Sequence, residues 1–204
     1  MAKFPEPPRR LTIPAALRVL PAGTTVWRVY FVAGVHPTTW RDFRWFGPVN
    51  SRFDHHDSPA RVQSKGVLYG AMEPITCLAE VFQSTRAIDR STHAPWLVAF
   101  TTARELQLLD LTGTWPTRAG ASMAIHSGPR PKARRWSRAI YDAYPHVEGL
   151  WYASSMYAHR ASLALYERGK AAIPTAPSFH RALSDPALLS RLSAAAMTLG
   201  YRVV

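Results

Sequence analysis

The sequence predicts an α+β fold, because segments typical of strands and helices follow one another without the regular βαβ alternation of a doubly wound sheet. The chain of 204 residues suits one compact domain, and its 47% of hydrophobic residues can fill a sizeable core. It contains neither an internal repeat nor a low-complexity tract. We therefore expect a single domain over residues 26–204, preceded by an irregular lead-in over residues 1–25 that packs along its surface.

The first half of the domain is expected to carry two strands and one helix. Residues 26–32 (VWRVYFV) are rich in β-branched and aromatic side chains and predict a core strand, and residues 67–71 predict a second one. Between them, residues 33–66 hold turn-like clusters of Gly, Pro, Asn, Asp and His together with several aromatic residues, which indicates a long ordered loop. Residues 74–86 predict a helix, because apolar residues recur at helical spacing and Pro74 suits the first turn.

The second half continues the mixed pattern. Its clearest helix spans residues 131–144, where apolar side chains form one stripe and Lys and Arg occupy the rest. A last helix begins after Asp185, a residue type suited to the N-cap, and ends at Gly200. The other expected elements are strands over residues 97–101, 106–111, 150–154, 163–166 and 201–204, and a short helix over residues 117–127.

The chain is strongly basic, with a formal net charge of +12 that comes mostly from arginine. Such a charge fits a nucleic acid, an anionic small substrate or an acidic protein partner, or only an arginine-rich composition, and it does not choose among them. A single cysteine, Cys77, excludes an internal disulfide and fits a reducing compartment. No apolar run is long enough to span a bilayer, and the first residues lack the apolar centre of a signal peptide. We therefore expect a cytoplasmic protein with no membrane association.

Two arginines, a tyrosine and a glutamate are the residues that suggest chemistry. Arg28 lies on an apolar strand, where a buried guanidinium needs an anionic partner, and Arg52 stands in a similar aromatic setting. Tyr69 fits either a core tyrosine or a residue of a cleft. Glu80 lies off the apolar face of its helix, which fits either a solvated carboxylate or one that reaches a cleft. Together they suit a site that holds a phosphate-bearing nucleotide and breaks a bond to its sugar.

Three other features favour structural roles. In the tract from Arg52 to Asp57, the adjacent histidines of an extended segment point in opposite directions, and no spacing typical of a metal site follows. We therefore expect no metal. Cys77 has no neighbouring Cys–His pattern and fits a packed, inert thiol. The basic helix over residues 131–144 could contact nucleic acid, but a solvated face is the better explanation of its charges.

Four motifs together resemble the RES-domain family, the toxin components of bacterial toxin–antitoxin pairs. The order and spacing agree over roughly residues 26–170. The chain departs from the family where Pro74-Ile75-Thr76 replaces the frequent Pro-Glu-Thr, and where two adjacent serines leave open which one is functional. The motifs are Arg28, the tract Arg52-Phe53-Asp54, Leu68-Tyr69 followed by Pro74 and Leu78-Ala79-Glu80-Val81, and Tyr152-x-Ser154.

The resemblance implies a small mixed β-sheet core with peripheral helices, related in fold to the ADP-ribosyltransferases. It implies an enzyme that depletes NAD⁺ by cleaving its nicotinamide–ribose bond, with water or phosphate as acceptor. NAD⁺ is then a substrate, and no cofactor is expected. The expected protein partner is an Xre-like helix-turn-helix antitoxin, and a homodimer is left open. Two alternatives remain: transfer of ADP-ribose to a protein or nucleic acid, and a non-catalytic basic module that binds nucleic acid.

The resemblance also assigns roles to residues of this chain. Glu80 would be the catalytic carboxylate, with Arg28 and Ser154 completing the catalytic set. The NAD⁺-binding set would comprise Arg28, Arg52, Tyr30, Tyr69 and Ser155, with Arg28 and Arg52 on the pyrophosphate and Tyr69 against the nicotinamide end. The chemistry is consistent with one carboxylate, because nicotinamide leaves as a neutral group and needs no general acid. A carboxylate can stabilise the positive charge that develops on the ribose.

Overall fold

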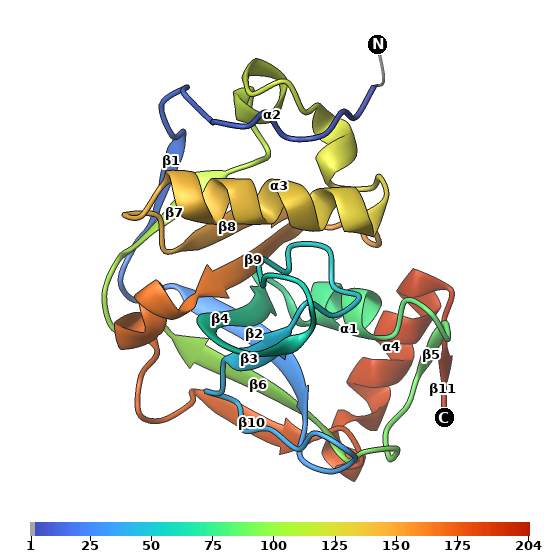
Figure 1. Ribbon diagram of the computed structural model, residues 1–204. Coiled ribbons are helices and arrows are strands. Elements are labelled where there is room, and N and C mark those ends of the chain that lie inside the picture. The colour runs from blue at the N-terminus through green and yellow to red at the C-terminus, as the bar shows by residue number, and fades with distance from the viewer. Residues whose placement is uncertain (1–2) are drawn as a thin grey trace.

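The computed structural model describes residues 3–204 and confirms an α+β fold with a mixed central sheet and peripheral helices (Figure 1). No helix among these residues is long and apolar enough to cross a membrane. The strands are β1 (Leu17–Leu20), β2 (Thr25–Phe31), β3 (Arg44–Gly47), β4 (Arg61–Ala71), β5 (Ala87–Ile88), β6 (Pro95–Thr101), β7 (Leu106–Asp110), β8 (Gly149–Ala153), β9 (Ala161–Tyr166), β10 (Phe179–Ala182) and β11 (Arg202–Val203). The helices are α1 (Pro74–Val81), α2 (Trp115–Arg118), α3 (Arg130–Ala143) and α4 (Leu189–Leu199), with 3-10 turns η1 (Met123–Ile125), η2 (Glu167–Ala172) and η3 (Pro186–Leu188).

Nine strands form the main sheet in the order β1-β7-β8-β9-β4-β2-β6-β10, with β3 paired to β4. The pair β7–β8 is parallel, and the other neighbours are antiparallel. A separate two-stranded parallel sheet joins β5 and β11. The sheet is larger than expected because β1, β3 and β10 extend it.

Helix α3 lies across β7 and β8 and buries one stripe against the sheet (Figure 1). Its buried residues recur at helical spacing, as the sequence predicts. The N-terminal lead-in packs alongside this helix, where Trp136 Nε1 donates to Pro5 O at 2.9 Å and Tyr144 Oη donates to Ile13 O at 2.8 Å. The buried residues of α3 are Ala133, Trp136, Ser137, Ile140 and Tyr141.

The main sheet divides between β2 and β4. Strand β2 pairs with β6 at seven positions, but its register with β4 holds at a single pair, Trp27 and Ala71. The backbones are close there, since a Cβ on Gly70 would lie 3.0 Å from Trp27 O. Past this pair the two strands no longer form a ladder. One half-sheet therefore ends at β4 and the other begins at β2, and α1 follows directly from the end of β4.

Several element boundaries differ from the sequence prediction. Strand β1 lies in the expected lead-in and pairs with β7, about ninety residues later in the chain. The local sequence pattern therefore does not predict this strand. Strand β3 lies in the expected loop, and it pairs with a polar extension of β4 that begins at Arg61 instead of residue 67. Helix α1 ends at Val81 instead of residue 86, although Phe82 remains buried and prolongs the apolar pattern. The helix expected over residues 117–127 is two short turns, α2 and η1, separated by Gly120 at a φ of 88°.

Candidate active site

Glu80 and Ser154 meet at the ends of two elements that are far apart in the sequence. Glu80 lies in the last turn of α1, and Ser154 directly follows β8. Ser154 Oγ donates a hydrogen bond to Glu80 Oε1 at 2.5 Å. Strands β4 and β8 both run antiparallel to β9 and therefore point in the same direction. Helix α1 and Ser154, which follow these strands, thus lie at the same end of the sheet. The structure thus brings together the predicted catalytic carboxylate and one of the two candidate serines.

Ser154 is fixed by its own turn, whereas Ser155 is exposed. The Ser154 side chain is fully buried, and its Oγ accepts the backbone N–H groups of Met156 and Tyr157, each at 3.1 Å. Its backbone N–H donates to Arg160 O at 2.7 Å. The hydroxyl therefore has one direction left for its proton, and that direction is occupied by Glu80.

Helix α1 is held on two sides, which fixes where Glu80 lies. Cys77 Sγ donates to Trp27 O at 3.1 Å, and Tyr201 Oη donates to Ala79 O at 3.2 Å. Cys77 is buried, and burial raises the pKa of its thiol, as expected of a packed, inert cysteine. The thiol's structural contact connects α1 to the half-sheet that begins at β2.

Arg52 is the predicted substrate-binding residue that lies beside this pair. Its guanidinium donates to Gly128 O at 2.6 Å, just before α3. Burial and the positive charge of Arg130 lower the pKa of Arg52, while the negative charge of Glu80 acts in the opposite direction. The arginine is therefore close enough to Glu80 for the two charges to interact, although no direct ion pair between them is present among the described residues.

Two tyrosines line the same region. Tyr152 precedes Ser154 by two residues along an extended segment, so both side chains emerge on the same face. Its ring packs on Phe53 with 4.6 Å between centroids, and burial and the charge of Glu80 raise the pKa of its hydroxyl. Tyr69 is half-buried on β4, and its hydroxyl has no hydrogen-bond partner among the described residues. Tyr152 was not among the predicted site residues, although the period of two along β8 could have identified it.

Arg28 lies on the other half-sheet, and among residues 3–204 it forms no hydrogen bond or ion pair with Glu80, Ser154 or Arg52. One position beyond the Trp27–Ala71 pair, its Nη1 donates to Trp40 O and to Asp42 O, each at 3.0 Å. Burial lowers the pKa of Arg28 to about 10. Within the described residues, its remaining N–H groups have no acceptor, so a half-buried cation is left without a bonded anion.

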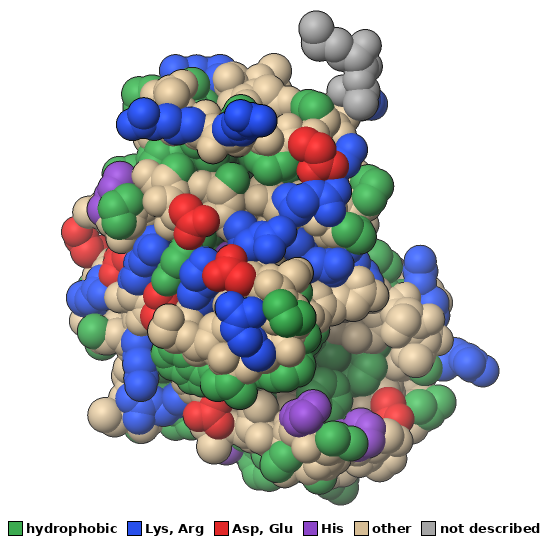
Figure 2. All heavy atoms as spheres, viewed as in Figure 1, with side chains coloured by type: hydrophobic (Ala, Val, Ile, Leu, Met, Phe, Trp, Pro, Cys, Tyr) green, Lys and Arg blue, Asp and Glu red, His purple; other side chains and the backbone are tan. Residues whose placement is uncertain are grey.

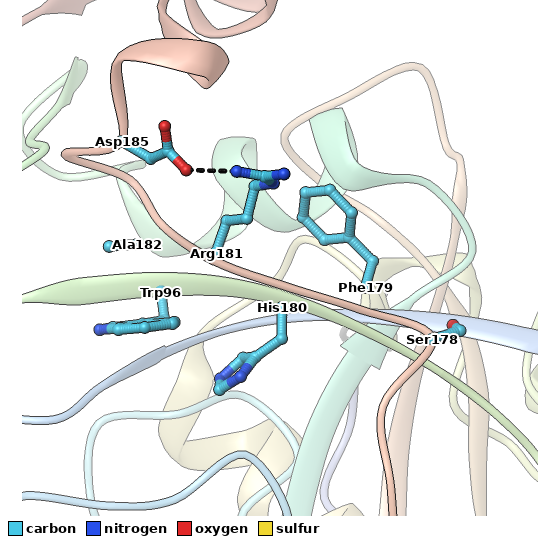
Figure 3. Close-up of a pocket in the computed structure, with 7 residues that line it drawn as sticks. All are labelled: Trp96, Ser178, Phe179, His180, Arg181, Ala182 and Asp185. Carbon is cyan, nitrogen blue, oxygen red and sulfur yellow. Dashed lines mark hydrogen bonds and ion pairs between the residues drawn. The ribbon is translucent and has the colours of Figure 1, made fainter.

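Tyr30, the second predicted residue on β2, forms part of an aromatic cluster. Its hydroxyl lies 2.5 Å from His180 Nε2, and the His180 ring packs near Trp96 with 4.5 Å between centroids. Trp96 and His180 line a pocket of about 560 Å³ at β10 and lie on one side of that strand, while Arg181 bonds Asp185 on the other (Figure 3). None of the predicted site residues lines this pocket, but Tyr30 pairs with Trp96 across β2 and β6 and bonds His180, and both of those residues line it.

The tract that follows Arg52 is a buried polar cluster. Asp54, His55 and His56 are each almost fully buried, and Asp54 bonds His56 and Arg44. Burial alone would raise the pKa of Asp54, but the hydrogen bonds from His56 and Val49 outweigh it and lower the pKa to about 2. Among residues 3–204 no group of three His, Cys, Asp or Glu side chains could hold a metal ion. The absence of a metal requirement stays a prediction.

The surface around the site is basic. Figure 2 shows Lys and Arg side chains gathered in a band over α3 and the segment in front of it, with a hollow floored by hydrophobic side chains below the band and next to α1. Arg44, Arg52, Arg130 and Arg134 are all partly exposed members of these segments. The candidate site thus combines one carboxylate with an excess of guanidinium groups, an arrangement suited to an anionic substrate.

Both a family model and solved structures match this chain. A family model described as the RES domain matches residues 25–184. Among solved structures, the fold is similar to a chain in the crystal structure of the M. tuberculosis MbcT-MbcA toxin-antitoxin complex, with a TM-score of 0.57 and 16% sequence identity over 86% of this chain and 92% of that chain. At that identity the likeness concerns the fold. A search of curated proteins finds no match.

The matched region holds β2, α1, α3 and β8 and every residue of the site. Of the motif residues that resemble this family, Arg28 lies on β2, Arg52 on the segment after β3, Glu80 on α1 and Ser154 directly after β8. Because the family model covers well over half of the chain, the protein belongs to the RES domain family.

Proposed function

We propose that this protein cleaves the nicotinamide–ribose bond of NAD⁺ and thereby acts as the toxin of a toxin–antitoxin pair. One observation carries the proposal: the hydrogen bond from Ser154 to Glu80, made beside Arg52. A serine hydroxyl that donates a hydrogen bond to a carboxylate holds that carboxylate in one orientation. An oriented anion next to a guanidinium is the minimum needed to bind a dinucleotide diphosphate and stabilise a cationic ribose.

The chemistry assigns a distinct task to each group. Nicotinamide departs as a neutral molecule, and the ribose carbon gains oxocarbenium character that Glu80 stabilises electrostatically. Ser154 orients Glu80. Arg52 and Arg28 supply planar donors that match phosphate oxygens, a geometry that lysine does not reproduce. Tyr69, whose hydroxyl has no partner among the described residues, packs against the nicotinamide end.

A partner protein follows from the basic surface and from the fold neighbour. The structure similar in fold is that of a toxin–antitoxin complex, and the chain carries a net charge of +12. We propose an acidic antitoxin, of the Xre-like helix-turn-helix class that the sequence resemblance implies, and a cytoplasmic location for the pair. Charge complementarity would speed the association of the two proteins.

The alternative of a nucleic-acid-binding module finds less support. On the basic helix α3, Arg130 donates to Gln83 Oε1 at 2.6 Å, Arg134 to Val49 O at 3.2 Å, and Arg135 to both oxygens of Glu6. Lys132 donates to Phe4 O at 2.6 Å. These cations bind the protein's own lead-in and loops, so most of the helix's charge has a structural use.

The experiment is an incubation of the purified protein with NAD⁺, followed by chromatography and mass spectrometry of the products. Free nicotinamide with ADP-ribose in a phosphate-free buffer indicates hydrolysis, and a phosphorylated ADP-ribose that forms only in phosphate buffer indicates phosphorolysis. Label transferred from NAD⁺ to a protein or nucleic acid indicates ADP-ribosylation instead. Absence of nicotinamide in both buffers contradicts the proposal.

A further inference from the structure

The carboxylate of Asp54 is fully buried two residues after Arg52, and four donors surround it. Oδ2 accepts Val49 N at 2.6 Å and Arg44 Nη2 at 3.0 Å. Oδ1 accepts His56 Nδ1 at 2.5 Å and His56 N at 3.2 Å. A buried carboxylate with every lone pair directed at a donor is rigid, because losing any one bond leaves a buried polar group unsatisfied.

These four donors come from both sides of the segment that carries Arg52. Arg44 belongs to β3, Val49 precedes Arg52, and His56 follows it. Asp54 therefore closes residues 49–56 into a loop whose two ends are bonded to one side chain. A Cβ on Gly47 would lie 2.6 Å from the His56 ring, so the loop is also packed tightly against β3.

The opposite face of the loop is fastened to the domain. Ser137 Oγ of α3 donates to Phe53 O at 3.0 Å, and the Phe53 ring packs on Tyr152, two residues before Ser154. Arg52 directly precedes Phe53 and lies within the loop that Asp54 closes. Its guanidinium reaches Gly128 O and the neighbourhood of Glu80 without being part of a strand or helix.

We infer that Asp54 is a positioning residue that fixes Arg52 for binding the diphosphate of the substrate. The inference rests on the proposed function for the identity of the substrate. Asp54 does not touch the site itself and acts through the loop it closes. An irregular segment lacks the backbone hydrogen bonds that orient the side chains of a strand. Here the hydrogen bonds of the buried Asp54 carboxylate fix the segment instead.

The test compares Asp54→Asn with Asp57→Asn, a matched change in the same tract at a half-buried carboxylate that pairs with Lys65. In Asp54→Asn, an amide nitrogen replaces one carboxylate oxygen and cannot accept the hydrogen bonds that this oxygen accepts. We expect the KM for NAD⁺ to rise about tenfold with kcat changed less than about twofold, the signature of lost ground-state and transition-state binding alike. Asp57→Asn should leave both constants unchanged.

A second variant separates positioning from general stability. In an Arg52→Ala background, Asp54→Asn should raise KM no further, because the group it positions is gone. Equal effects of Asp54→Asn with and without Arg52, or an unchanged KM for the single variant, would overturn the inference.

Hydrogen exchange measured by mass spectrometry gives a readout that needs no substrate. Asp54→Asn should accelerate exchange over residues 49–56 and leave α1 protected, whereas Asp57→Asn should leave residues 49–56 as protected as in the unmodified protein. Unchanged exchange over residues 49–56 refutes the positioning role. If the unmodified protein releases no nicotinamide, the proposed function fails, and the exchange result alone then decides whether Asp54 holds the loop.

Discussion

Arg28 and Arg52 are expected to perform the same task, yet the fold positions them by different means. Arg28 lies in the seven-pair ladder between β2 and β6, and its guanidinium is oriented by two loop carbonyls. Arg52 lies on an irregular segment closed by the buried carboxylate of Asp54. An arginine can thus be held either by a regular strand or by a loop that a buried, fully hydrogen-bonded carboxylate closes. The candidate site thus has two sides: Arg52 lies on the side with Glu80 and Ser154, and Arg28 lies on the other side.

Loss of the Glu80 charge should reduce activity most, because Glu80 is the carboxylate that bonds Ser154 on the Arg52 side. Glu80→Gln keeps the shape of the side chain and removes its charge, so the developing positive charge on ribose loses its stabilisation. We expect nicotinamide release to fall by about 10²–10³-fold, the range seen when one electrostatic group of an active site is removed. Thermal unfolding should stay close to that of the unmodified protein, which excludes a loss of fold as the cause. Activity retained in Glu80→Gln would show that another group performs this task.

The two arginines should differ in stability more than in activity. Arg28→Ala and Arg52→Ala each remove charged donors to phosphate, and each should lower kcat/KM by roughly 10–100-fold. Arg28→Ala also breaks two hydrogen bonds to the segment around Trp40, so its melting temperature should fall further than that of Arg52→Ala, which breaks one. Calorimetry measures the melting temperatures of both variants, and steady-state kinetics measures their kcat/KM. Equal melting temperatures would contradict the difference in anchoring.

The adjacent serines provide a sharper contrast on the Arg52 side. Ser154→Ala removes the hydroxyl that bonds Glu80 and should lower activity by about tenfold, in line with the loss of one hydrogen bond to a charged group. Ser155→Ala changes an exposed residue and should have no effect on the same assay. Loss of activity in Ser155→Ala but not in Ser154→Ala would reverse the assignment.

The smallest effect concerns the pH dependence of stability on the Arg52 side. Burial, helped by the neighbouring His56, lowers the pKa of His55 to about 3, well below the ordinary value of about 6.5. Below about pH 6.5 the unfolded chain binds a proton at His55 that the folded protein does not bind. The free energy of unfolding is therefore highest above about pH 6.5 and decreases progressively as the pH falls toward about 3. We expect the melting temperature to drop by roughly 4 °C per pH unit in this window. His55→Phe, which fills the same site without a titrating group, should flatten that dependence.

Residues on regular elements could be predicted from the sequence far better than those in loops. The strand holding Arg28 and the stripe of α3 follow from β-branched runs and helical spacing, and the mixed sheet follows from their order. Strands β1 and β3 could not be found that way, because their partners lie elsewhere in the sequence and their own patterns are short. The contact between Ser154 and Glu80 spans 74 residues and depends on strand order. Asp54 was visible as part of a motif, but its four donors are set by tertiary structure.

The family motifs predict which residues form the site, but they do not predict how these residues lie relative to one another. The sequence suggests two arginines side by side on a pyrophosphate, but the structure places Arg28 on β2 and Arg52 on an irregular segment after β3, on opposite sides of the Trp27–Ala71 pair where the half-sheets meet. Their shared role therefore stays a prediction, and it requires a substrate that spans the division between the half-sheets. A dinucleotide, with two phosphates between two sugars, has the extended form that such a division can accommodate.

The most direct test of the central claim is the time course of nicotinamide release from NAD⁺ by the purified protein and its Glu80→Gln variant, assayed with and without phosphate. We expect steady release by the unmodified protein in at least one buffer and almost none by the variant. Equal release by both proteins would contradict the role of Glu80, and no release by either would contradict the proposed activity itself.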